Sequence, residues 1–153
     1  MSSNVNIRIA NQNDVEDILA LIKELAIFEQ AESSVINTKE QLLIDGFSNN
    51  PVFTCFVAQH DNKIIGIALC YVRYSTWQGK CLFLEDLIVT SSYRGKGIGS
   101  MLFNACLDYS KSIGYYKMQW QVLDWNVKAI DFYEKLGALT DKEWWNMSIK
   151  TVE

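Results

Sequence analysis

The chain of 153 residues has the length of a single domain, and its 49% apolar and 21% charged residues are typical of a folded globular protein. Its formal net charge of −4 argues against a nucleic-acid partner and is compatible with a cationic small-molecule substrate. No apolar run is long enough to span a membrane, and the N-terminal residues lack the pattern of a signal peptide, so we expect a cytoplasmic protein without a membrane partner.

The cysteines and the single histidine do not have the spacing of a metal site or of a Ser-His-Asp triad. His60 stands beside Asp61 and Asn62, two residues that favour a turn. Each cysteine lies in an apolar run, so we expect buried free thiols rather than disulfides. These residues are Cys55, Cys70, Cys81 and Cys106. We therefore expect no metal cofactor.

Hydrophobic periodicity and turn residues predict the elements in chain order. The first half is expected to contain a strand at 5–9, a helix at 15–28, a short helix from 38 to 46, and a hairpin of strands at 53–59 and 63–73. The second half is expected to contain a strand at 81–89, a helix at 98–113, a strand at 117–123, a helix from 126 to 137, and a last strand at 144–149. This order predicts one mixed α/β domain over residues 1–153, with a mixed sheet and helices on both faces.

The stretch from Arg94 to Ser100 reads Arg-Gly-Lys-Gly-Ile-Gly-Ser and joins a predicted strand to a predicted helix. Its alternating glycines allow positive φ and close backbone approach, and the helix start suits a phosphate group. Arg94 and Lys96 add positive charge. The Walker and dinucleotide-binding patterns are both absent. Taken alone, the stretch is equally compatible with a glycine-rich turn that has a basic rim.

The pattern Arg94-x-x-Gly97-x-Gly99, together with Asn126 and Phe132-Tyr133, resembles the GNAT superfamily of N-acetyltransferases. Scattered matches over nearly the whole chain are similar to its spermidine/spermine N-acetyltransferase branch. They are Leu21–Ala26, Asp45–Phe47, Trp77, Gly79-Lys80, Leu84–Asp86, Tyr93–Gly95, Gly97–Ser100, Trp125-Asn126 and Gly137. The resemblance implies a homodimer and a mostly antiparallel sheet that is splayed at the cofactor cleft, where the strand that ends at Val89 bulges and separates from the strand at 117–122. It also implies direct acetyl transfer from acetyl-CoA to a small di- or polyamine through a tetrahedral intermediate.

The resemblance also implies a set of cofactor-binding residues. For the thioester and pantetheine arm these are Leu87, Ile88 and Val89, and for the pyrophosphate they are Arg94, Gly95, Lys96, Gly97, Ile98, Gly99 and Ser100. Asn126, Ala129 and Tyr133 complete the set. The Tyr133 hydroxyl would protonate the leaving thiolate. Helical periodicity alone would make Tyr133 a core aromatic residue.

Carboxylates are expected to bind and deprotonate the amine acceptor, because an alkylammonium has a pKa of roughly 10.4 and cannot attack while charged. We expect Glu85 to point into the pocket, where it handles the amine proton or binds the cation. Strand alternation would place Asp86 on the opposite face, with one of the two in a structural ion pair. The further candidates for acceptor binding are Phe28, Glu29, Trp77, Asp86 and Glu143.

Three alternatives remain open at this point. Glu29 is also compatible with a solvated helix end, and Phe28 stands where the branch is expected to have a tyrosine. The acceptor is either a di- or polyamine, an amino acid side chain such as that of thialysine, or a protein amine. A cofactor-binding protein without turnover is a further reading, but such a protein would need neither Glu85 nor Tyr133.

Overall fold

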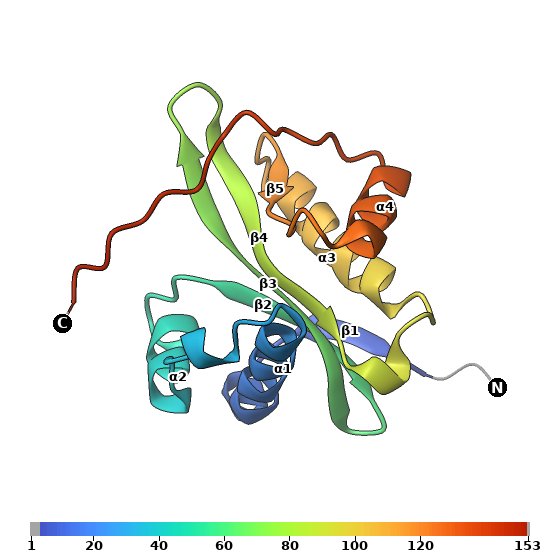
Figure 1. Cartoon of the computed structure of the whole chain (residues 1–153). Coiled ribbons are helices and arrows are strands. Elements are labelled where there is room, and N and C mark those ends of the chain that lie inside the picture. Colours follow the sequence, from blue (N-terminus) through green and yellow to red (C-terminus); the bar gives the residue numbers. More distant parts are fainter. Residues whose placement is uncertain (1–3, 153) are drawn as a thin grey trace. The chain divides into compact units, whose positions relative to one another are not determined.

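The computed structural model describes residues 4–152, which divide into a first unit that ends at Gln121 and a second unit that begins at Val122. The strands of the first unit are β1 (Asn6–Ile9), β2 (Thr54–His60), β3 (Lys63–Ser75), β4 (Gly79–Val89) and β5 (Met118–Trp120) (Figure 1). Its α-helices are α1 (Val15–Phe28), α2 (Lys39–Phe47) and α3 (Ile98–Ser112). Short 3-10 turns lie at η1 (Gln12–Asp14), η2 (Glu32–Ser34) and η3 (Ser91–Tyr93).

The five strands form one sheet in the order β1-β2-β3-β4-β5. Strands β1 to β4 pair antiparallel, and β5 pairs parallel to β4. Asp61 and Asn62 connect β2 to β3 with φ values of 47° and 63°, which a tight hairpin turn with the twist of the strands requires. The predicted hairpin and the predicted mixed, mostly antiparallel sheet are therefore confirmed.

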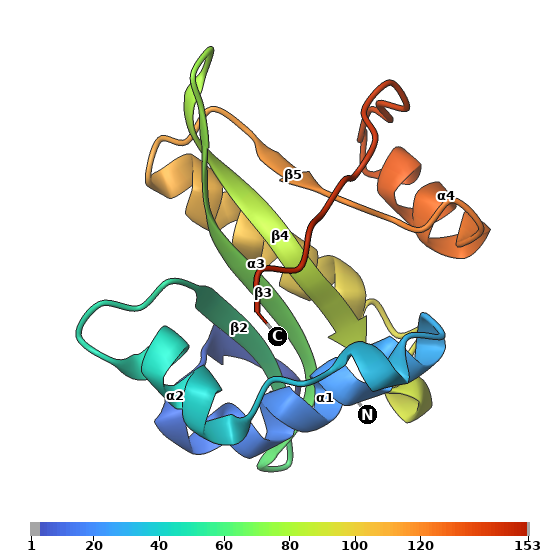
Figure 2. The ribbon, with the colours of Figure 1, turned by 60° about the vertical axis from the view of Figure 1, so that its left-hand side comes forward.

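Helices cover both faces of this sheet, as predicted (Figures 1 and 2). On one face, Ile18 and Leu21 of α1 pack in a buried cluster with Val57, Ile67 and Ile88 of the strands. On the other face, α3 packs so closely that a Cβ at Gly66 would lie 3.0 Å from a methyl carbon of Leu102. All four cysteines are buried and free, which confirms that prediction.

The second unit contains helix α4 (Val127–Lys135), and both of its predicted ends are confirmed. Asn126 caps the start, because its Oδ1 accepts a hydrogen bond from the Ala129 N–H at 3.3 Å. Gly137 follows the helix with a φ of 89°. In neither unit do the described residues contain a helix long and apolar enough to cross a membrane.

Of the strand predictions in the C-terminal part, one is confirmed over a shorter range and one is wrong. The strand predicted at 117–123 covers only Met118–Trp120, and residues 144–149 form neither helix nor strand. Apolar alternation in 144–149 matches the period of a strand, but a strand also needs a neighbour that accepts and donates its backbone hydrogen bonds. The described residues of the second unit offer no other strand for that pairing.

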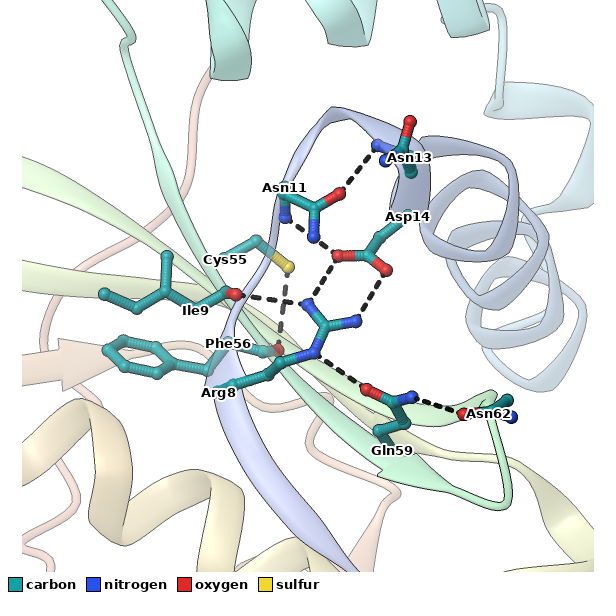
Figure 3. A network of polar contacts seen from close by, with 9 residues as sticks. All are labelled: Arg8, Ile9, Asn11, Asn13, Asp14, Cys55, Phe56, Gln59 and Asn62. Carbon is teal, nitrogen blue, oxygen red and sulfur yellow. Dashed lines mark hydrogen bonds and ion pairs between the residues drawn. The ribbon is translucent and has the colours of Figure 1, made fainter.

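A polar network at one end of the sheet connects β1, the start of α1 and β2 (Figure 3). The Arg8 guanidinium donates to both carboxylate oxygens of Asp14, at 2.7 and 2.8 Å, and its Nε donates to Gln59 at 2.8 Å. The Asn11 N–H donates to Asp14 at 2.8 Å and completes a capping box. The hydrogen bonds from Arg8 hold the pKa of the buried Asp14 carboxyl below its ordinary value, although burial opposes them.

We predict that Arg8→Met lowers the free energy of unfolding by about 3 kcal/mol at neutral pH, because it leaves a buried carboxylate without its partner. The pKa of Asp14 is lowered in the folded state, so its contribution is present above its unfolded pKa of about 3.9. The gap between wild type and variant should therefore narrow as pH falls through the lowered pKa.

Urea unfolding over a pH series measures this difference. Lys39→Met is the control, because it removes one partner of an exposed ion pair with Glu16 and should change stability little. An equal loss in the two variants would contradict a structural role for the Arg8–Asp14 pair.

Candidate active site

Strand β4 contains a bulge at Glu85. In the pairing with β3, Leu84 lies opposite Cys70 while Asp86 lies opposite Leu69, so Glu85 is an extra residue with no partner of its own. An extra residue bends the strand and interrupts the alternation of its side chains. The two neighbouring carboxylates therefore do not have to lie on opposite faces of the sheet.

The bulge places Glu85 and Asp86 on the same face, the one that α1 covers. Asp86 lies opposite Leu69, which belongs to the buried cluster beneath α1. Tyr71 is two residues beyond Leu69 on β3 and shares that face. Burial raises the pKa of the Tyr71 hydroxyl, and the charge and hydrogen bonding of Glu85 raise it further. The expectation that alternation separates the two carboxylates is wrong because of the bulge.

Asp86 is the more enclosed of the two carboxylates. Glu85 is exposed and Asp86 is half-buried, and the expectation that Glu85 points into the acceptor pocket stays a prediction. Burial raises the pKa of Asp86 to about 6, with smaller contributions from the negative charges of Glu85 and Glu29. Among residues 4–152, no lysine or arginine lies within ion-pair distance of either carboxylate.

Glu29 follows the last residue of α1 and is the third member of this acidic group. It is close enough to Asp86 for its charge to raise the Asp86 pKa. Its own side chain is exposed, yet the neighbouring atoms remove enough water to raise its pKa. The structure therefore brings together Glu29, Glu85 and Asp86, which the sequence analysis had named separately.

Within the first unit, one predicted acceptor residue does not lie in this group. Trp77 is at the tip of the β3–β4 hairpin and is 89% exposed. The extended run from Gly79 to Glu85 alone spans about 20 Å, so Trp77 is too far along the hairpin to contact Glu85 or Asp86 of the same chain. Glu143 lies in the second unit, where its N–H donates to Asp141 at 2.9 Å.

The edge of β4 that faces β5 is open beyond the bulge. Pairing with β5 covers Leu82 to Leu84 and ends there, which confirms the predicted splaying of the sheet. The Thr90 N–H donates to Ile65 on β3 at 2.9 Å. Because alternate residues of a strand direct their backbone groups to the same side, Leu87 and Val89 direct theirs to the open edge.

The glycine loop that follows has the backbone expected of an anion site. Gly95 and Gly97 have φ values of 75° and 80°, and Gly97 is the N-cap of α3. No heavy atom lies within 4 Å of the place where a Cβ would stand at Gly95, Gly97 or Gly99. No side chain caps this end of α3, so N–H groups of its first turn remain available to a phosphate. Ile98 is buried in the core, and Ser100 is half-buried.

Both basic residues of the loop fold back on the protein. Arg94 donates from Nε to the Val89 carbonyl at 2.8 Å, and its Nη2 lies 3.5 Å from a carboxylate oxygen of Glu24. Lys96 donates to the Ser92 carbonyl at 3.3 Å, and its Nζ lies 4.9 Å from the centre of the Tyr93 ring. In this arrangement the N–H groups of the loop backbone, rather than the Arg94 and Lys96 side chains, are available to bind an anion.

Glu24 and Tyr71 were not identified from the sequence. Glu24 stands three residues after Leu21 and four before Phe28, which places it beside the apolar face of α1. A charged residue beside the apolar face of a helix was the feature of the sequence that could have identified Glu24. The position of Tyr71 follows from the β3–β4 hairpin. The observed register that pairs Ser75 with Gly79 also pairs Tyr71 with Phe83, so counting residue pairs from the hairpin turn reaches Tyr71.

The remaining cofactor candidates belong to the second unit and stay predictions. Asn126, Ala129 and Tyr133 lie at the start and in the body of α4, with Ala129 and Tyr133 one turn apart on one helix face. The Tyr133 ring meets that of Phe132 with centres 5.2 Å apart. Over residues 4–152, no three His, Cys, Asp or Glu side chains are grouped as a metal site would need.

Comparison with known proteins finds an acetyltransferase (GNAT) family model that matches residues 16–138. A thialysine N-epsilon-acetyltransferase of Sus scrofa is 39% identical over 94% of this chain and 91% of its own length. A spermidine/spermine N(1)-acetyltransferase-like protein of Homo sapiens is 35% identical over 92% of this chain and 22% of its own. Among solved structures, an aminoglycoside acetyltransferase from an uncultured soil metagenomic sample matches with a TM-score of 0.82 at 23% identity, covering 97% of this chain and 99% of its own.

We predict that Asp86→Asn stabilises the folded protein at pH 7 by at most about 3 kcal/mol, as measured by urea unfolding. The pKa of Asp86 is raised to about 6 in the folded state, so wild type loses stability as pH rises from about 4 through 6. Asparagine has the same shape without the charge. The gain should vanish below pH ~4, where the carboxyl is protonated in both states.

Asp108→Asn is the control, because Asp108 is exposed on α3 and should show no such pH-dependent gain. If Asp86→Asn were no more stable than wild type at pH 7, this would contradict the claim that burial of the charged Asp86 carboxylate destabilises the folded protein.

Proposed function

The chain belongs to the GNAT acetyltransferase family, and from that premise we propose that its acceptor is a small di- or polyamine. The protein is an acetyl-CoA-dependent N-acetyltransferase, and acetyl-CoA supplies the acetyl group as a thioester. The observation that carries the proposal is the acidic group of Glu29, Glu85 and Asp86, for which the described part of the chain supplies no ion-pair partner. A molecule with two or more ammonium groups would supply the missing positive charge.

We place acetyl-CoA along the open edge of β4 and the glycine loop. Leu87 and Val89 would offer backbone groups to the pantetheine arm, and residues 95–100 would hold the pyrophosphate. The open space above the three glycines supports this fit. Arg94, Lys96, Asn126 and Ala129 complete the proposed contacts from the family resemblance. The family model spans both units, so we further propose that they form one domain, and that the enzyme is a homodimer.

We assign the amine proton to Asp86 and the second cation to Glu85 and Glu29. A base works best when its pKa lies near the working pH, and Asp86, with a pKa of about 6, is nearer to it than an ordinary carboxylate. Glu85 is exposed, which suits it to bind a charged group at the entrance. This assignment exchanges the roles that the sequence analysis had expected for the two residues.

The remaining steps use one backbone group and one side chain. The Leu87 N–H on the open edge would stabilise the oxyanion that forms when the amine attacks the acetyl carbon. The Tyr133 hydroxyl would donate a proton to the departing thiolate, a role carried from the family resemblance. Leu87 lies two residues beyond the bulged Glu85, so one segment of β4 would serve both the acceptor and the acetyl group.

A second candidate acceptor is an amino acid with an amino side chain, such as thialysine. The name of the relative at 39% identity supports it, and so does Arg73. This exposed residue is two positions beyond Tyr71 on the same face of β3, with its guanidinium 5.6 Å from the centre of the Phe83 ring. Arg73 could meet the carboxylate that distinguishes an amino acid from a diamine.

A matched pair of acceptors distinguishes the two candidates. The pair is thialysine and the diamine that remains when the carboxylate of thialysine is removed. We predict that the diamine has a kcat/KM about 10-fold higher, because the carboxylate of thialysine would place a fourth negative charge beside Glu29, Glu85 and Asp86. Release of free CoA thiol measures both rates. Glu29→Gln should reduce the preference, and Glu32→Gln, an exposed neighbour, should not.

A preference for thialysine that is lost in Arg73→Met would replace the diamine by the amino acid as acceptor. Thiol release with neither compound, while other amines react, would exclude both candidates.

The cofactor placement predicts that Gly97→Ala binds CoA about 10-fold more weakly, because a methyl group would occupy the space proposed for a phosphate. Isothermal titration calorimetry measures the affinity. Gly114→Ala is a matched control, since Gly114 has a φ of 73°, the same open surroundings, and a position just after the other end of α3. Each variant should be destabilised by about 1–2 kcal/mol, and equal CoA affinity in the two would refute the placement.

A further inference from the structure

Glu24 on α1 uses both of its carboxylate oxygens to hold the segment between β4 and α3. Its Oε2 accepts a hydrogen bond from the Thr90 hydroxyl at 2.9 Å, and its Oε1 accepts one from the Ser91 N–H at 3.0 Å. The same Oε1 lies 3.5 Å from Nη2 of Arg94. These contacts reach both ends of the turn η3, so one half-buried carboxylate fixes the whole turn to α1.

Arg94 extends this network to the open edge of β4. Its Nε donates to the carbonyl of Val89 at 2.8 Å, and its guanidinium lies 5.5 Å from the centre of the Phe28 ring. Val89 is the last residue of β4, and Gly95, the first glycine of the loop, follows Arg94 directly. The guanidinium therefore connects the end of the edge to the beginning of the loop, while Glu24 holds the guanidinium.

We propose that Glu24 is a positioning residue for acetyl-CoA, because it keeps the glycine loop at a set distance from the open edge of β4. The inference rests on the proposed function, which takes this edge and this loop as the cofactor site. A loop whose N–H groups are already directed to the phosphates binds them without the entropic cost of ordering. Glu24 itself touches neither the cofactor nor the acceptor in this account.

A simple electrostatic account gives the opposite expectation. The phosphates of CoA are negative, so removal of a nearby carboxylate strengthens their attraction to the loop. It also frees Arg94 to form a charge-assisted hydrogen bond with a phosphate. If Glu24 only neutralised Arg94, then Glu24→Gln would bind CoA more tightly than wild type. If Glu24 positions the loop, the same variant binds CoA more weakly, so the sign of the change separates the two accounts.

The test is isothermal titration of the full chain with CoA at fixed ionic strength. Glu24→Ala should weaken binding by about 10-fold, which corresponds to the loss of a hydrogen bond to a charged group. Glu24→Gln and Thr90→Val each remove part of the network and should weaken binding by about 3-fold. Asp17→Asn removes one exposed negative charge from α1 and should bind CoA no more weakly than wild type.

Steady-state kinetics provide a readout that general damage would not reproduce. In Glu24→Ala, the KM for acetyl-CoA should rise while the KM for the amine and kcat at saturating acetyl-CoA stay close to wild type. If Glu24→Ala does not fold, Glu24→Gln and Thr90→Val decide the question. Wild type that fails to bind CoA would overturn the proposed function, whereas wild type that binds CoA no better than the Glu24 variants would overturn this inference alone.

Discussion

The bulge in β4 gives this strand one residue more than the segment of β3 that it pairs with, and the proposed active site is arranged around that extra residue. It turns Glu85 and Asp86 to one face of the sheet, where Glu29 at the end of α1 joins them. Beyond the bulge, β4 no longer pairs with β5, so the N–H groups of Leu87 and Val89 have no partner strand on that side. The bulge and the end of the β5 pairing thus lie side by side on β4, where we propose that the acceptor and the donor meet.

Helix α1 connects the two halves of this site. Glu24 binds the turn that precedes the glycine loop, and Glu29, five residues later, belongs to the acidic group. Burial, and to a smaller extent the negative charges of Glu85 and Glu29, raise the pKa of Asp86, so a charged Asp86 lowers the stability of the folded state. Such local destabilisation is expected where a protein keeps charges for a cationic substrate rather than for its own stability.

Local patterns in the sequence predicted most of the fold, because caps, glycines and periodicity act over a few residues. The helix at 15–28, the Asp61-Asn62 turn and the Asn126 cap are examples. Such local patterns do not predict the bulge, since it is a property of the register between two strands, but the family resemblance implied it and the structure confirms it. The strand predicted at 144–149 is wrong for a similar reason, because alternation of apolar and polar residues does not show whether a neighbouring strand is there to pair with. The contact between Arg94 and Glu24 was not predictable either, because it joins residues 70 positions apart in the sequence.

Amide hydrogen exchange at β4 tests the central claim most directly. The Leu87 and Val89 N–H groups face the open edge, whereas that of Ile88 faces β3. If the donor binds along this edge, saturating CoA should slow exchange at Leu87 and Val89 and leave Ile88, already protected by β3, nearly unchanged. Unchanged exchange at Leu87 and Val89 in the presence of bound CoA would contradict the account, because the cofactor would then lie elsewhere.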